Sequence, residues 1–200
     1  MRSARALPTR HLGLFFLTAA TLLAAATQSV WAAEDLKIGG NRGTMEFAIG
    51  DSRIFRTTGG FQTWQGNVQV NDADIPKSAV EVTVQTGSLK MMDRQQADML
   101  KDSDFFDVDR FPQMTFRSNK IERTGEETLK IDGFLTLRGV TRPMTLDVTL
   151  TDRKPNAAPG ARYARVRAKG TIKRSDFGMT KYVDLVGDNV EISITTDAWR

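Results

Sequence analysis

The chain has 200 residues, of which 28 are basic and 24 acidic, and it contains one histidine and no cysteine. The lack of cysteine excludes disulfides and thiolate nucleophiles, so packing alone must hold the core. The one histidine, His11, lies in the leader described next, and the rest of the chain therefore has no histidine-based catalytic triad and no zinc site of nitrogen and sulfur ligands.

Residues 1–32 are predicted to form a cleaved signal peptide. Three arginines precede an apolar run from Leu12 to Ala26, which is shorter than the about 20 residues that a membrane span needs. Cleavage is expected after Ala32, and the alternative is an uncleaved anchor. Without the leader, 25 basic residues face 24 acidic ones, a net charge of +1 that gives no general attraction to nucleic acid.

Residues 33–200 are expected to form one exported, periplasmic domain rich in β-strands. Apolar and polar side chains alternate there with the period of two that is typical of half-buried strands. The alternation is regular over residues 80–85, 129–138, 144–151, 164–173 and 190–195, and less regular near 44–50, 60–71 and 113–121. The segment Met91–Leu100 is predicted to be a short helix across one end of the sheet. Eight antiparallel strands with one apolar face favour closure into a barrel, since closure removes exposed edges.

The inward face of these strands mixes small and large side chains. Gly133, Ala164, Ala168 and Gly170 are small, whereas Phe116 and similar residues are large. A barrel of eight strands can be filled by side chains or can hold one small ligand. The small inward residues favour a cavity, and the alternative is that they relieve crowding where strands bend.

Asp176-Phe177-Gly178 spells the triplet that binds magnesium in protein kinases. The other kinase motifs, a glycine-rich loop, a strand lysine and a catalytic HRD loop, are absent from the sequence, which favours a structural interpretation. We expect a strand to end at Lys173, Arg174 to pair with Asp176 at the barrel rim, Phe177 to plug the end of the barrel, and Gly178 to permit a turn.

Four aspartates between residues 102 and 109 suggest a calcium site, but Gln113 stands where an EF-hand requires glutamate. We interpret this stretch as a solvated loop whose Phe105, Phe106 and Phe111 seal one end of the barrel or form the mouth of an apolar tunnel. No pair of carboxylates has a pattern that implies a shared catalytic cleft. No catalytic residues and no metal ligands are therefore predicted.

Three stretches of the sequence resemble the YceI-like family of exported bacterial lipid-binding proteins, also called polyisoprenoid-binding. They are residues 103–121, residues 131–150, and residues 171–182 followed by 186–194. The resemblance extends over nearly all of the exported domain. It implies a lipocalin-like barrel with an apolar tunnel for a long isoprenoid chain, a periplasmic location, and links to quinones, b-type cytochromes or stress responses.

Two places depart from the family pattern. Many members carry His-Leu-Gly or His-Phe-Gly near the second strand, where this chain has Arg53-Ile54-Phe55-Arg56. The usual Ser-Ile-Asp-Thr after the third strand is replaced by Gly87-Ser88-Leu89-Lys90. Both places are expected near the barrel ends, where the head of a ligand would lie.

The sequence therefore predicts a non-enzymatic periplasmic protein that sequesters a long-chain isoprenoid or similar fatty amphiphile. No cofactor is expected other than a bound isoprenoid or quinone-like lipid, and the resemblance implies transient contact with the membrane or a b-type cytochrome. The predicted tunnel wall consists of Phe47, Phe61, Trp64, Val84, Met114, Phe116, Leu135 and Ile172, and the predicted end residues are Phe105, Phe106 and Phe177. The alternatives are a filled barrel that docks by its surface on a membrane redox or stress-response system, and a carboxylate-dependent hydrolase.

Overall fold

The computed structural model describes residues 34–50, 56–154 and 158–200. The predicted signal peptide and its cleavage site lie outside these ranges, as do Arg53, Ile54 and Phe55 of the first departure from the family pattern. In the described ranges, no helix combines the length and the apolar character that crossing a membrane requires.

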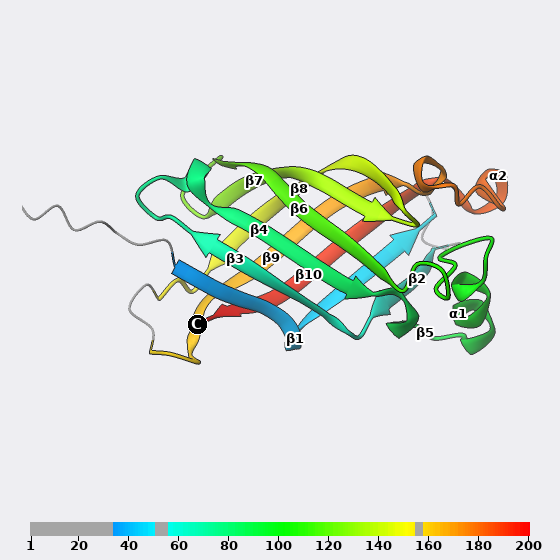
Figure 1. Ribbon diagram of the computed structural model, residues 1–200, viewed down its shortest axis with the longest axis horizontal. Helices are drawn as coiled ribbons and strands as arrows, with labels where there is room; N and C mark the ends of the chain where they lie inside the picture. Colours follow the sequence, from blue (N-terminus) through cyan, green and yellow to red (C-terminus); the bar gives the residue numbers. More distant parts are fainter. Residues whose placement is uncertain (1–33, 51–55, 155–157) are drawn as a thin grey trace, which may run out of the picture. The chain divides into compact units, whose positions relative to one another are not determined.

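Ten strands and five short helical segments make up the described chain (Figure 1). The strands are β1 (Glu34–Ile49), β2 (Thr57–Phe61), β3 (Trp64–Val70), β4 (Ala79–Gln85), β5 (Leu89–Met91), β6 (Gln113–Arg123), β7 (Thr128–Leu137), β8 (Val140–Thr151), β9 (Arg162–Lys173) and β10 (Asn189–Trp199). The helical segments are α1 (Arg94–Lys101), α2 (Val183–Val186) and the 3₁₀ turns η1 (Ile75–Lys77), η2 (Thr86–Ser88) and η3 (Arg174–Phe177).

All the paired strands are antiparallel, and β1 pairs with β10 to close the sheet. Two residues separate β2 from β3, and η2 separates β4 from β5, so each of these pairs is one strand with a bend. β1 pairs with β3 over its first part and with β2 over its last part. Counted this way, the fold is the predicted closed barrel of eight antiparallel strands, and the fold prediction is confirmed.

The bend in β1 depends on glycine. The register between β1 and β10 shifts between Ile38 and Gly43, and Gly39 and Gly40 have φ values of +94° and +58°. A Cβ on Gly39 would lie 2.7 Å from the carbonyl oxygen of Trp64 on the neighbouring strand. The left-handed backbone and this close approach both require a residue without a side chain.

The predicted helix at 91–100 begins three residues later than expected, at Arg94. Met91 stays in β5 because that strand pairs with β2. The carboxylate of Asp93 accepts hydrogen bonds from the backbone N–H groups of Gln95 at 2.8 Å and Gln96 at 3.3 Å, which fixes the start of α1. Figure 1 shows α1 and α2 at the same end of the barrel.

The end of the barrel away from α1 and α2 is filled by side chains. Six inward residues there are at most 6% exposed: Leu36, Ile121, Ile131, Val148, Ala164 and Ala198. Ala and Gly leave room for larger neighbours at such positions, and close packing of this kind excludes water from the strand ladders. The filled half therefore provides most of the barrel's rigid core.

Candidate functional site

A cavity of about 270 Å³ lies in the half of the barrel covered by α1 and α2. In the described chain, every strand except β3 contributes to its wall, together with α1, α2 and the loops beside them. This volume is far larger than the about 10–15 Å³ that one water molecule needs. The polar side chains in the wall are few: Glu46, Thr57, Gln96, Thr115, Arg174, Lys181 and Tyr182.

The exposure of the inward isoleucines shows where the barrel is hollow. Ile172, Ile192 and Ile194 line the cavity and are only half-buried, although they lie on the inner face of a closed barrel. Farther along the same two strands, the much smaller Ala164 and Ala198 are fully buried. The three isoleucines line the cavity whereas Ala164 and Ala198 do not, so the cavity ends before the filled half of the barrel begins.

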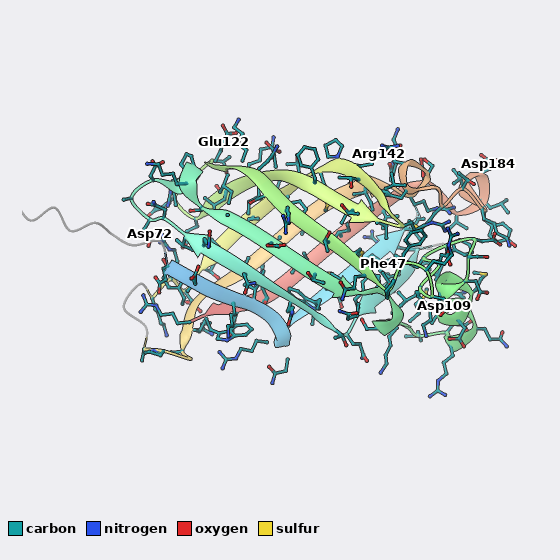
Figure 2. All side chains as sticks on the ribbon, in the orientation of Figure 1. Phe47, Asp72, Asp109, Glu122, Arg142 and Asp184 are labelled. Atoms are coloured by element: carbon teal, nitrogen blue, oxygen red, sulfur yellow. The ribbon has the colours of Figure 1, made fainter. Side chains whose placement is uncertain are left out.

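Nine of the eleven predicted site residues line the cavity: Phe47, Phe61, Val84, Phe105, Phe106, Met114, Phe116, Leu135 and Ile172. Figure 2 shows Phe47 on the part of the barrel nearer the helices, whereas Asp72 and Glu122 mark the opposite end. Their role in binding a ligand stays a prediction.

Trp64 and Phe177 lie outside the cavity wall. Trp64 is 3% exposed on β3, the strand that contributes nothing to the wall, and it stands beside Gly39 in the packed part of the core. Phe177 is 2% exposed within η3. Both are buried in the core cluster, but neither lines the cavity.

The small inward residues do not line the cavity. Gly133, Ala164, Ala168 and Gly170 are absent from its wall. A Cβ on Gly133 would lie 2.6 Å from the ring of Phe116, and a Cβ on Gly170 would lie 2.9 Å from the end of Met144. These glycines make room for Phe116 and Met144, which line the cavity.

The aspartate-rich loop closes the cavity with its aromatic residues. The ring of Phe106 packs edge-on against Phe61 with centroids 5.5 Å apart, and Phe61 lies 5.9 Å from Phe47. Phe105 is 5% exposed and lies 6.5 Å from the ring of Tyr182, so this loop meets the segment before α2. Together the two segments cover the hollow end of the barrel.

Side chains of this loop and its surroundings hold the loop in place. Asp107 is buried with φ at +49°, and its Oδ2 accepts a hydrogen bond of 3.3 Å from Arg110. Arg138, in the turn between β7 and β8, donates to the carbonyl oxygens of Ser103 and Phe105. Within the described ranges, no three Asp, Glu, His or Cys side chains gather as a metal site would require.

The mouth of the cavity lies between α1 and the segment before α2. Met99 and Tyr182 line the cavity and yet are 40% and 47% exposed. Lys181 also lines it and pairs with Asp104 at the surface. Residues that touch both the cavity and solvent mark the route by which a ligand would enter.

The comparisons with known proteins agree with this architecture. A sequence model of the YceI-like domain matches residues 36–198. The chain belongs to the YceI-like family. Among its relatives are a UPF0312 protein of Pectobacterium atrosepticum, 30% identical over 94% of this chain and 96% of that protein, and protein YceI of Salmonella newport, 30% identical over 92% and 95%. The resemblance seen in the sequence is confirmed.

Solved structures of YceI-like proteins share the barrel. BcnA of Burkholderia cenocepacia is 25% identical, with a TM-score of 0.67 over 79% of this chain and 96% of that one. The Campylobacter jejuni YceI protein is 25% identical, with a TM-score of 0.65 over 76% and 90%. A polyisoprenoid binding domain from Saccharophagus degradans, 12% identical with a TM-score of 0.59 over 82% and 97%, has the same fold.

In this YceI-like chain, the RSDFG stretch fastens the cover of the cavity. The predicted pair between Arg174 and Asp176 is wrong, because Arg174 is 5% exposed and turns toward the barrel interior. Its Nε donates to the carbonyl oxygen of Gly187 at 3.0 Å, and its Nη1 donates to those of Met179 and Lys181 at 2.9 and 2.7 Å. The strand does end at Lys173, and Gly178 makes the turn with φ at +79°.

Asp188 holds η3 against the start of β10. Its carboxylate accepts hydrogen bonds from the backbone N–H of Ser175 at 2.9 Å and from the Ser175 hydroxyl at 2.7 Å. Burial alone would raise the pKa of this carboxyl. The Ser175 hydrogen bonds, with the charges of Arg174 and Lys173, outweigh burial and hold the pKa below its ordinary 3.8.

A carboxyl whose pKa is lower in the folded than in the unfolded state stabilises the fold at pH values above its unfolded-state pKa. This stabilisation is lost as the pH falls through the folded-state pKa. We therefore expect the free energy of unfolding of the wild type to fall more steeply than that of Asp188→Asn as pH is lowered through 3.8 and below. Urea titrations at a series of pH values measure both slopes. Parallel slopes would show that Asp188 does not contribute to acid sensitivity.

Proposed function

We propose that this protein binds a long-chain isoprenoid or similar amphiphile and places the apolar chain in the cavity beneath α1 and α2. The observation that carries the proposal is the cavity of about 270 Å³ with its almost wholly apolar wall. Transfer of a hydrocarbon chain from water into such a space is favourable by about 0.8 kcal/mol per methylene, before the ordering costs of binding.

The hollow favours lipid binding over the alternatives. A barrel that acts only through its surface needs no internal space, and an active site based on paired carboxylates needs a polar cleft. In the described chain, Glu46 is the one carboxylate residue in the wall, and its side chain is exposed. The solved domain from Saccharophagus degradans with this fold is described as polyisoprenoid binding, which supports the same ligand class here.

The proposal includes a periplasmic setting. It rests on the signal-peptide pattern of residues 1–32. Export is tested by the mass of the protein recovered from its own host, since cleavage after Ala32 removes a defined leader.

A chain-length series tests the function. Native mass spectrometry of protein purified from its host should show a co-purifying hydrophobic mass. After delipidation, the affinity for primary alcohols should rise about fourfold for each added methylene. It should then level off, because the far half of the barrel is filled. Isoprenoid alcohols of equal carbon number compare branched with straight chains. A clean apo mass together with no uptake of any alcohol would contradict the proposal.

A further inference from the structure

The cavity wall contains one buried charge. Of the charged residues that line the cavity within the described ranges, Glu46 and Lys181 have exposed side chains, and Lys181 is paired with Asp104. Arg174 is 5% exposed. Its guanidinium therefore places a fixed positive charge at an otherwise apolar wall, close to the mouth that Lys181 and Tyr182 mark.

The hydrogen bonds of Arg174 leave part of its guanidinium unused. Nε and Nη1 donate to three backbone carbonyl oxygens, as described above. Nη2 has no acceptor among the described residues, yet it is not one of the fully enclosed polar atoms that lack a partner. Arg174 is one of the residues that line the cavity, so a ligand held there lies beside this side chain.

No described carboxylate forms an ion pair with this guanidinium. Asp188 acts on it only at longer range, and its oxygens are already bonded to Ser175. Burial lowers the pKa of Arg174, and the charge of Asp188 offsets this in part. A guanidinium nevertheless stays protonated at neutral pH. An anion beside it would supply the missing acceptor and the missing counter-charge.

We propose that Nη2 of Arg174 donates a hydrogen bond to an anionic oxygen, a carboxylate or a phosphate, on the head of the bound amphiphile. This inference rests on the proposed function and names the head group that the cavity selects. The head then lies near the mouth and the apolar chain extends toward the filled half. The three carbonyl bonds hold the guanidinium in place, so little side-chain entropy is lost when the anion binds.

Ligands of equal chain length with different heads test the proposal. We expect delipidated wild-type protein to bind dodecanoate and dodecyl phosphate at least about tenfold more tightly than dodecanol, since a hydrogen bond between two charged groups is stronger than one between neutral groups. Whichever of the two anions binds more tightly identifies the head group as a carboxylate or a phosphate. Equal affinities for all three ligands would overturn the proposal and leave the proposed function standing, whereas no binding of any of them would contradict both.

Variants separate anchoring from a purely structural role. In Arg174→Met, the ratio of anion to alcohol affinity should fall to about one, whereas a loosened cover would weaken all three ligands alike. Lys181→Met is the matched control, because it removes the other basic side chain of the wall and should leave most of the ratio intact. A ratio that depended on Lys181 rather than on Arg174 would overturn the assignment.

A measurement on the wild type alone covers the case in which Arg174→Met does not fold. The carboxyl carbon of labelled dodecanoate reports by NMR whether the bound head is ionised. Beside the guanidinium, the pKa of the bound carboxyl should lie below that of the free monomer. In an apolar wall without such a contact it would be raised. A raised pKa would contradict the proposal.

Discussion

Replacing Ile194 by tryptophan is expected to reduce the affinity for a long-chain ligand roughly 50-fold while the barrel stays folded. Ile194 is half-buried and faces the cavity from β10. If the larger ring displaces about three methylenes of the bound chain at about 0.8 kcal/mol each, the loss is about 2.4 kcal/mol. The ring enters existing space, so the core does not have to be repacked.

The neighbouring position supplies the control. Ser193 lies on the same strand and is exposed on the outer face, where it pairs in register with Lys169 of β9. Ser193→Trp adds the same ring outside the barrel and should leave the affinity unchanged. Titration with a long-chain alcohol measures both variants, and circular dichroism confirms that both are folded. Equal affinities in the two variants would mean that the ligand does not occupy this cavity.

The alternation of side chains predicts the barrel and its inward face because a strand has a period of two. Phe47, Val84 and Leu135 could therefore be assigned to the interior from the sequence alone. Alternation carries no information about position along the barrel axis. Trp64 has the same inward pattern as Val84, its partner in the register between β3 and β4, yet only Val84 reaches the cavity.

The role of Arg174 could not be predicted for a different reason. A rule based on neighbours in the sequence pairs it with Asp176, two residues away. Its actual acceptors are carbonyl oxygens of residues 179, 181 and 187, which approach only because the chain after Gly178 folds back over the barrel end. Every residue has a backbone carbonyl group, so the residue types do not indicate which carbonyl accepts the hydrogen bond. This contact can be seen only in the structure.

The two stretches that depart from the family pattern have different positions in the structure. Residues 87–90 lie in η2 and β5, next to α1, which agrees with their expected place near a barrel end. Leu89 is 2% exposed and belongs to the core, so this stretch contributes packing there. In the other stretch, Arg56 pairs with Glu191 on the outer surface. Arg56 therefore does not supply the charge of the cavity wall, whereas Arg174 lines that wall.

Phe177→Ala is expected to lower the free energy of unfolding by about 3–5 kcal/mol. Phe177 is 2% exposed and packs within the main core cluster, while it lies outside the cavity wall. Truncation therefore removes contacts and leaves an enclosed hole. The hole lies at the end of the barrel where Arg174 and η3 are located. Because a small domain is stable by only about 5–15 kcal/mol, this is a large fraction of the total.

Asp176→Ala distinguishes this structural role from a chemical one. Asp176 is exposed, and an exposed residue without specific partners changes stability by at most about 0.5 kcal/mol when replaced. Urea denaturation of both variants gives the comparison. A small effect for Asp176 beside a large one for Phe177 means that the triplet contributes to stability through its aromatic ring and not through its carboxylate. The reverse order would mean that the Asp176 carboxylate stabilises the fold through a contact which the packing of η3 does not reveal.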